Sequence, residues 1–129
     1  MAKRYELILY TGTDIDYSNF IADYIEEEYD VEFAYRLYED QCVIKNSVCM
    51  FKYLNILSKG RSLKDIVIVD DRVQNYAFSL RNGIPIKFYD GDNRDKELIY
   101  LAKYLRILAE KKDVTKQVEE DFAKCLLNS

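Results

Sequence analysis

The sequence IVIVDD, residues 66–71, carries the clearest strand signal in the chain. Its four consecutive β-branched residues are typical of a strand covered on both faces, as in a parallel sheet. Upstream, YELILY at residues 5–10 is a second apolar run, and it leads into the turn-forming sequence Thr11-Gly12-Thr13. Both runs therefore predict buried strands that end at polar residues.

The spacing of apolar residues predicts helices and further strands on either side of these two runs. Asp14 or Asp16 is expected to cap a helix over about residues 17–28, and Asp92 to cap a long helix. The other expected elements are a strand over 33–38, a hairpin of 42–44 and 48–51 around 45–47, a loop containing 74–78, a strand over 83–86 with Pro85 at an edge, an apolar stripe at Leu98, Leu101, Leu105 and Leu108 on the long helix, and a last helix over 115–127 with Val118, Phe122 and Cys125 on its apolar face.

Strands that alternate with helices predict an α/β fold with a mostly parallel sheet between two layers of helices. A chain of 129 residues with 49% hydrophobic and 33% charged residues is expected to form one domain's worth of packed core. Within it we expect a main part over residues 1–114 and a C-terminal amphipathic helix over residues 115–129, packed on or beside that part.

Composition excludes several classes of function. The chain has no histidine, so histidine-activated nucleophiles, histidine metal ligands and an imidazole pH switch are excluded. A net charge of −4 disfavours nonspecific binding to nucleic acid. The three cysteines, Cys42, Cys49 and Cys125, lack CxxC spacing, which argues against a disulfide framework or zinc knuckle and favours an intracellular, reducing compartment. No apolar run reaches the length of a membrane span.

Polar residues at the carboxyl ends of the two buried strands are candidates for a ligand site, because ligands gather there in parallel sheets. Thr11, with neighbouring backbone N–H groups, could hold a phosphoryl oxygen, or could simply bond its own turn. Asp70 and Asp71 could bind Mg²⁺, which takes oxygen ligands, or could form a turn. Lys52 could neutralise a phosphoryl group, or could be a solvated surface lysine.

Five blocks in order carry a resemblance to a known family: YELILYTGT at 5–13, RLYEDQCVI at 36–44, FKYL at 51–54, IVIVDD at 66–71 and NGIPIKFYDGDNRDKEL at 82–98. From residue 5 to about 114 the chain resembles the carboxy-terminal two thirds of the haloacid-dehalogenase-type phosphatase domain of the RNA polymerase II C-terminal-domain phosphatases. The same domain occurs in the NLI-interacting-factor group and in the mitochondrial presequence-translocase receptor. The resemblance does not choose between nucleus, cytoplasm and mitochondrion.

The resemblance implies roles for the candidate residues. Thr11, with Gly12, is similar to the phosphate contact of the family's second motif, and Lys52 to the lysine of the third. Asp70 and Asp71 are similar to the metal-binding pair of the fourth motif, which implies Mg²⁺ as cofactor. The family's nucleophile comes from a DxDxT motif on an upstream strand, and the 129 residues do not contain it. The spacing at residues 14–18 (DIDYS) is similar, but three residues separate Asp14 from its strand, so helix capping is the expected role there.

In the family, the motif-bearing strand lies at the centre of the sheet, between the strands that end at Thr11 and Asp70. The expected fold is therefore a haloacid-dehalogenase-like, Rossmann-like sheet that lacks this strand and has a small hairpin insertion. Either the two inner strands pair directly, or another polypeptide supplies the strand.

Three hypotheses for function follow. The leading one is a truncated or degenerate phosphatase-type domain, incompetent alone, that interacts with protein partners in a larger assembly. The alternative is part of a Mg²⁺-dependent phosphoserine/threonine protein phosphatase whose nucleophile motif comes from another chain or region. Retained binding of Mg²⁺ or phosphate without turnover is the third. A phosphoreceiver domain, which can also open with IVIVDD, is excluded by the order of the motifs, and a ligand-free structural module remains open.

Overall fold

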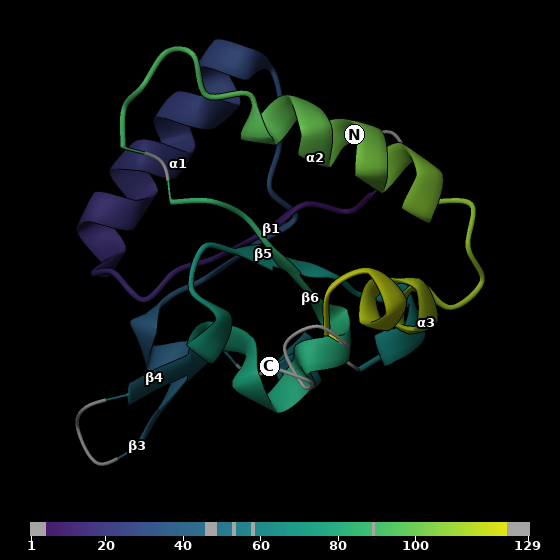
Figure 1. Ribbon diagram of the computed structural model, residues 1–129. Coiled ribbons are helices and arrows are strands. Elements are labelled where there is room, and N and C mark those ends of the chain that lie inside the picture. The colour runs from purple at the N-terminus through teal and green to yellow at the C-terminus, as the bar shows by residue number, and fades with distance from the viewer. Residues whose placement is uncertain (1–4, 46–48, 53, 58, 89, 124–129) are drawn as a thin grey trace. The chain divides into compact units, whose positions relative to one another are not determined.

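Parallel strand pairs and helices form a mixed α/β fold in the computed structural model, which describes residues 5–45, 49–52, 54–57, 59–88 and 90–123 (Figure 1). The chain divides into two compact units, Met1–Lys52 and Tyr53–Ser129. The strands form three two-stranded sheets in the described residues, in place of the single sheet expected.

The first unit begins with a strand-turn-helix unit, as predicted. Strand β1 (Ile8–Tyr10) is followed by helix α1 (Ile15–Tyr29) and by strand β2 (Tyr35–Leu37), which pairs in parallel with β1. Asp14 caps α1, because its Oδ1 accepts a hydrogen bond from Tyr17 N at 2.9 Å. The helix ends at Asp30, which has a left-handed backbone with φ 51°.

Helix α1 packs mainly through small and polar side chains. It buries the small residues Ser18 and Ala22, whereas Phe20 and Tyr24 are exposed. Arg36 of β2 joins the strand to the helix through Asn19, Asp23 and Glu26, with contacts of 2.9, 2.9 and 2.6 Å. Short polar side chains and this ion-pair network therefore hold α1 to the sheet, in place of an apolar stripe.

The predicted hairpin is present. Strand β3 (Cys42–Lys45) pairs antiparallel with β4 (Cys49–Lys52) and follows a short 3-10 helix, η1 (Glu39–Gln41). The expected turn at residues 45–47 falls mostly on residues 46–48, which lie outside the described residues.

The second unit is built around β5 (Ile68–Asp70) and β6 (Gly83–Pro85), which pair in parallel. Both faces of the segment 66–69 are covered, as predicted for a β-branched run. Ile66 and Ile68 belong to one apolar cluster with Leu54 and Tyr76, and Val67 and Val69 pack against a second cluster. The second cluster joins β6 to the C-terminal helices through Ile84, Leu108, Val114 and Val118.

Short 3-10 helices and three further helical segments complete the second unit. They are η2 (Leu54–Leu57), η3 (Leu63–Asp65), η4 (Val73–Asn82), α2 (Glu97–Leu108), α3 (Val114–Val118) and the π-helical η5 (Glu119–Ala123). The expected loop at residues 74–78 is therefore part of η4, which is interrupted at Tyr76 and Ser79.

The predicted cap of the long helix is wrong. Helix α2 starts at Glu97 after Lys96, and no side chain caps it at Lys96. Asp92 instead closes a turn, accepting a hydrogen bond from Arg94 N at 2.9 Å. Of the predicted leucine stripe, Leu108 is fully buried and Leu101 and Leu105 pack against the same cluster. Leu98, in the first turn of the helix, is 72% exposed.

The last helix is shorter than expected in the described residues. Val118 of α3 is buried and Phe122 of η5 packs against the same cluster, edge-on to Tyr104 at 5.3 Å between ring centroids. Cys125 and the end of the predicted helix lie outside the described residues.

Candidate phosphate and metal site

Among the candidate residues, Asp70 has a buried side chain whose orientation is fixed by hydrogen bonds. It is the last residue of β5, where backbone pairing to β6 fixes it: its carbonyl oxygen accepts from Ile86 N at 3.2 Å. Its side chain is buried, with 6% exposed, and is held by three hydrogen bonds. Oδ1 accepts from Arg72 N at 3.0 Å and from Asn75 Nδ2 at 3.1 Å, and Oδ2 accepts from Asn75 Nδ2 at 3.2 Å.

Asp71 differs from its neighbour, because it is exposed and lies in the bend after the strand. The two carboxylates thus stand at one strand end, one buried and oriented, the other in solvent. This arrangement matches the donor chemistry of Mg²⁺, which commonly takes one or two carboxylates and fills its other positions with water and phosphate oxygens. The described residues contain no group of three or more acidic or cysteine side chains that could hold a metal without such help.

Tyr76 is a buried neighbour of this site that the sequence analysis did not identify. Its ring lies against β6 at Gly83, where an added Cβ would come within 2.0 Å of the ring. Its hydroxyl has no hydrogen-bond partner among the described residues. Burial raises the pKa of Tyr76, and the negative charge of Asp70 raises it further. A tyrosine five residues beyond an acidic pair is a weak signal by itself, since its burial depends on the path of η4.

Thr11 stands directly after β1, and its backbone is part of the parallel ladder, with Thr11 N donating to Leu37 O at 3.0 Å. Its hydroxyl accepts from Thr13 N at 3.2 Å and lies 2.9 Å from the Thr13 hydroxyl. Thr13 in turn contacts the buried Ser18 hydroxyl at 2.5 Å. The Thr11 side chain thus forms the local turn that was the simpler interpretation, while Thr11 and Gly12 remain half-buried at the strand end.

Lys52 is the last residue of β4 and is half-buried. Thr11, Gly12 and Lys52 all belong to the first unit, and Asp70 and Asp71 belong to the second. The structure brings the two carboxylates together at one strand end, and it describes the threonine and the lysine at the ends of two other strands.

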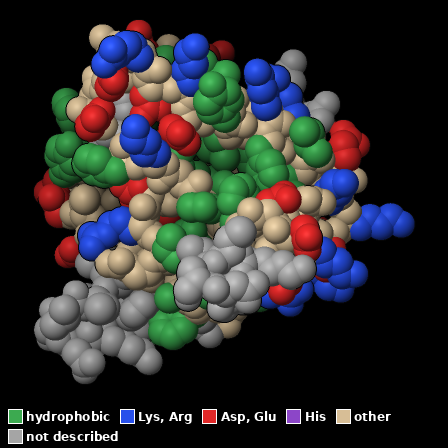
Figure 2. Space-filling view, viewed as in Figure 1, with side chains coloured by type: hydrophobic (Ala, Val, Ile, Leu, Met, Phe, Trp, Pro, Cys, Tyr) green, Lys and Arg blue, Asp and Glu red, His purple; other side chains and the backbone are tan. Residues whose placement is uncertain are grey.

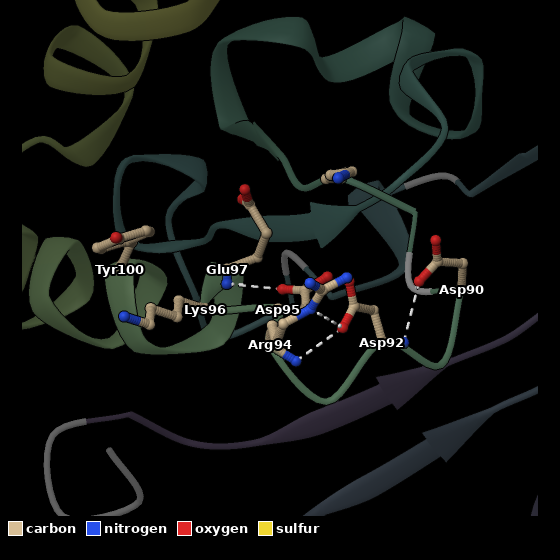
Figure 3. A pocket seen from close by; sticks show the side chains of 8 residues that line it. Asp90, Asp92, Arg94, Asp95, Lys96, Glu97 and Tyr100 are labelled. Carbon is tan, nitrogen blue, oxygen red and sulfur yellow. Dashed lines mark hydrogen bonds and ion pairs between the residues drawn. The ribbon is translucent and has the colours of Figure 1, made fainter.

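A second group of acidic side chains lies in the loop before α2 (Figure 3). This loop borders a pocket of about 280 Å³, lined by Asp90, Asp92, Asp95 and Glu97 together with cationic residues. Asp92 is paired with the Arg94 guanidinium at 3.1 Å, and this hydrogen bond is the main reason that the pKa of Asp92 is lowered. Asp95 accepts from Glu97 N at 2.8 Å at the start of α2. These bonds shape the turn, so we assign the loop a structural role.

Comparison with known proteins identifies the domain. Residues 1–115 match the profile of the NLI interacting factor-like phosphatases. The chain belongs to this family. It is 35% identical over 119 residues to CTD small phosphatase-like protein 2 of Dictyostelium discoideum, with 92% of this chain and 20% of the relative covered.

Two further relatives support the same assignment. CTD small phosphatase-like protein 3 of Caenorhabditis elegans is 34% identical over 112 residues, covering 84% of this chain and 36% of the relative. Nuclear envelope morphology protein 1 of Saccharomyces cerevisiae is 29% identical over 122 residues, covering 88% and 27%. The chain thus spans 20% to 36% of the length of these three relatives.

As an NLI interacting factor-like phosphatase domain, the chain has the α/β character and the family resemblance predicted from its sequence. Among the residues that the structure describes, no helix is both long enough and apolar enough to span a bilayer.

Proposed function

We propose that this 129-residue chain is a phosphatase-type domain that retains phosphate- and metal-binding groups, does not turn over substrate by itself, and works in contact with a protein partner. The family membership supports the phosphatase character. The sequence supports the lack of turnover, because no DxDxT motif is present to supply the carboxylate that forms an aspartyl-phosphate. The odd number of cysteines and their lack of CxxC spacing support a reducing, intracellular compartment.

The observation that carries the proposal is the pairing of β5. Successive residues of a strand direct their backbone N–H and C=O groups to opposite edges, and Asp70 O bonds toward β6. Val69 therefore directs its backbone polar groups to the other edge, where the described residues place no paired strand. Apolar clusters cover both faces of β5, and a further strand at that edge would pair these backbone groups.

The partner that we propose would bind at the same edge. A strand from another polypeptide, or from another region of the natural protein, could add to β5 by main-chain hydrogen bonds. If that strand carries the nucleophilic aspartate, it would arrive beside Asp70 at the carboxyl end of the sheet.

A second candidate function rests on the orientation of the Asp70 carboxylate. Its carboxylate is already oriented by Asn75 and by Arg72 N, and Asp71 stands next to it in solvent. Such a preserved pair favours a Mg²⁺-dependent phosphoserine/threonine protein phosphatase that becomes active once the nucleophile motif is supplied. In it, Asp70 and Asp71 would hold Mg²⁺, which would offset phosphate charge. By the family resemblance alone, Thr11, Gly12 and Lys52 are the proposed phosphate-binding groups.

The test is hydrolysis of an aryl phosphate by the purified chain, with and without Mg²⁺. We expect no turnover by the chain alone and Mg²⁺-dependent turnover when a segment carrying DxDxT is added. Replacing both Asp70 and Asp71 by Asn should abolish the restored activity, whereas Gln74→Ala, a nearby exposed change, should not. Turnover by the chain alone that this double substitution abolishes would overturn the proposal.

Ligand binding separates the remaining possibilities. Calorimetric titration with Mg²⁺ and with inorganic phosphate should give measurable heat, and the Asp70→Asn, Asp71→Asn chain should lose the Mg²⁺ signal. Absence of heat with both ligands would leave interaction with a partner as the sole function of the proposal.

A further inference from the structure

A groove in the second unit carries a charge opposite to that of the chain as a whole. It has a volume of about 900 Å³ and is bordered by η3, η4 and the start of α3. Three cationic side chains line it, Lys64, Arg81 and Lys116, against one carboxylate, Asp113. On a chain of net charge −4, this is a local concentration of positive charge.

The groove is distinct from the candidate metal site. Helix η3 ends just before β5 and η4 ends just before β6, so the groove lies beside the amino ends of these strands. Asp70 stands at the carboxyl end of β5. The two sites therefore lie at opposite ends of the same parallel pair.

The wall of the groove is held in a defined shape. Asn82 is buried, with 4% exposed, and its Nδ2 donates to Leu63 O at 2.7 Å and to Ile66 O at 2.8 Å. These bonds tie the end of η4 to η3. At the opposite wall, Asp113 Oδ1 accepts from Thr115 N at 3.0 Å and from the Thr115 hydroxyl at 2.5 Å.

The three cationic side chains of the groove differ in their ion pairs. Arg81 pairs with Glu119 at 2.6 Å, which joins η4 to η5. The ammonium groups of Lys64 and Lys116 form no salt bridge within 4 Å of a described carboxylate, and both side chains are exposed. The pKa of Asp113 is lowered mainly by the Thr115 hydroxyl, and also by the charges of Lys64 and Lys116, which places both lysines in its neighbourhood.

We propose that this groove binds an acidic peptide segment of a partner protein. Lys64 and Lys116 are exposed and lie on two elements that border the groove, η3 and α3, so both can pair with carboxylates of a segment that lies in it. Phe78 also lines the groove and is 49% exposed, which offers an apolar surface for a side chain between the acidic ones. The site is independent of phosphatase turnover, so it works whether or not the chain is ever catalytically active.

The experiment measures fluorescence anisotropy of a labelled peptide in which glutamates alternate with leucine and phenylalanine. The full chain should bind this peptide and discriminate against the same peptide with glutamine in place of glutamate. Lys64→Glu combined with Lys116→Glu should weaken binding by about tenfold or more, and Phe78→Ser should weaken it by a smaller factor. Affinity should fall as salt rises, because the contacts are between exposed charges.

A matched control separates the groove from bulk charge. Lys96→Glu combined with Lys103→Glu makes the same change in net charge at exposed positions that do not line the groove, and should alter affinity by no more than about twofold. Thermal unfolding midpoints verify that each variant is folded, and Lys64→Gln with Lys116→Gln provides a milder pair should charge reversal disturb folding.

Three results would overturn the proposal. Equal losses in the groove and control pairs would reduce the effect to overall charge. Equal binding of the glutamate and glutamine peptides would remove the electrostatic basis. Tighter binding of a single-stranded RNA oligonucleotide than of the acidic peptide would assign the groove to a different class of partner.

Discussion

Asn75 determines the orientation of the Asp70 carboxylate. Its amide nitrogen reaches both carboxylate oxygens, at 3.1 and 3.2 Å. Removing a hydrogen-bond donor from a buried carboxylate costs about 1 to 3 kcal/mol. We therefore expect Asn75→Ala to lower the free energy of unfolding by that amount in urea titrations. Gln74→Ala, one residue earlier and exposed, should be near neutral, and equal effects of the two substitutions would contradict this role for Asn75.

Tyr76 presents the opposite case, a buried hydroxyl without a partner among the described residues. We expect Tyr76→Phe to raise the free energy of unfolding at neutral pH by about 1 kcal/mol, because it removes an uncompensated polar group and keeps the ring. The pKa of Tyr76 is raised in the folded state, so above the unfolded value of 10.0 the tyrosine ionises more readily in the unfolded chain. The ionisation of Tyr76 therefore leaves the free energy of unfolding unchanged below pH 10 and lowers it as the pH rises beyond that value. The Phe variant should therefore lose less stability above pH 10. Destabilisation by Tyr76→Phe at neutral pH would mean that the hydroxyl is bonded.

Gly83 is required by the ring that packs on it. A Cβ at this position would lie 2.0 Å from Cε2 and 2.1 Å from Cδ2 of Tyr76, closer than atoms can approach. Gly83→Ala should destabilise the protein by about 2 to 3 kcal/mol through overpacking. The same substitution in a Tyr76→Leu background should cost clearly less, and a double-mutant cycle with no coupling between the two positions would disprove the contact.

At the scale of elements, helix α1 depends on a local cap. Asp14 bonds Tyr17 N at 2.9 Å, and such caps are worth about 1 kcal/mol. Asp14→Ala should lower the free energy of unfolding by that amount and reduce helical circular dichroism on heating. Asp16→Ala, in the first turn but without the cap bond, should cost only a few tenths of a kcal/mol. A larger loss from Asp16 would reassign the cap.

Of the two helix caps expected from the sequence, Asp14 caps its helix and Asp92 does not, for a physical reason. At Asp14 the helix begins with the next residue, so the carboxylate reaches an unpaired N–H of the first turn. At Asp92 an arginine two residues later offers both a backbone N–H and a guanidinium, and these bonds close a turn before the helix starts. A nearby cation thus outcompetes the helix terminus for the carboxylate.

At the scale of the whole molecule, large hydrophobic side chains are exposed to solvent. Exposed large hydrophobic side chains occur on α1 and α2, among them Phe20 at 71% and Leu98 at 72%, and Figure 2 shows hydrophobic side chains reaching the surface between charged ones. Apolar surface of this kind favours association with another polypeptide.

If a further strand completes the sheet, it should stabilise the chain by mass action. A peptide carrying a DxDxT strand, added at a hundredfold excess over its dissociation constant, should contribute about 2.7 kcal/mol and raise the unfolding midpoint. A peptide with proline at the strand centre, which cannot pair, should have no effect. No shift with the strand peptide, together with a monodisperse monomer in native mass measurement, would argue against completion by a partner.

The sequence by itself determined the features that reside within a few consecutive residues. These are the β-branched strand that ends at Asp70, the Asp14 cap, the hairpin and the family blocks, because hydrogen bonds and patterns over three or four residues do not depend on the rest of the chain. Tertiary structure alone decided that Asn75 holds Asp70, that Tyr76 packs on Gly83, and that Lys64 and Lys116 border one groove. Those relations depend on where the interrupted helix η4 and the C-terminal helices pack, and packing is set by burial summed over distant segments.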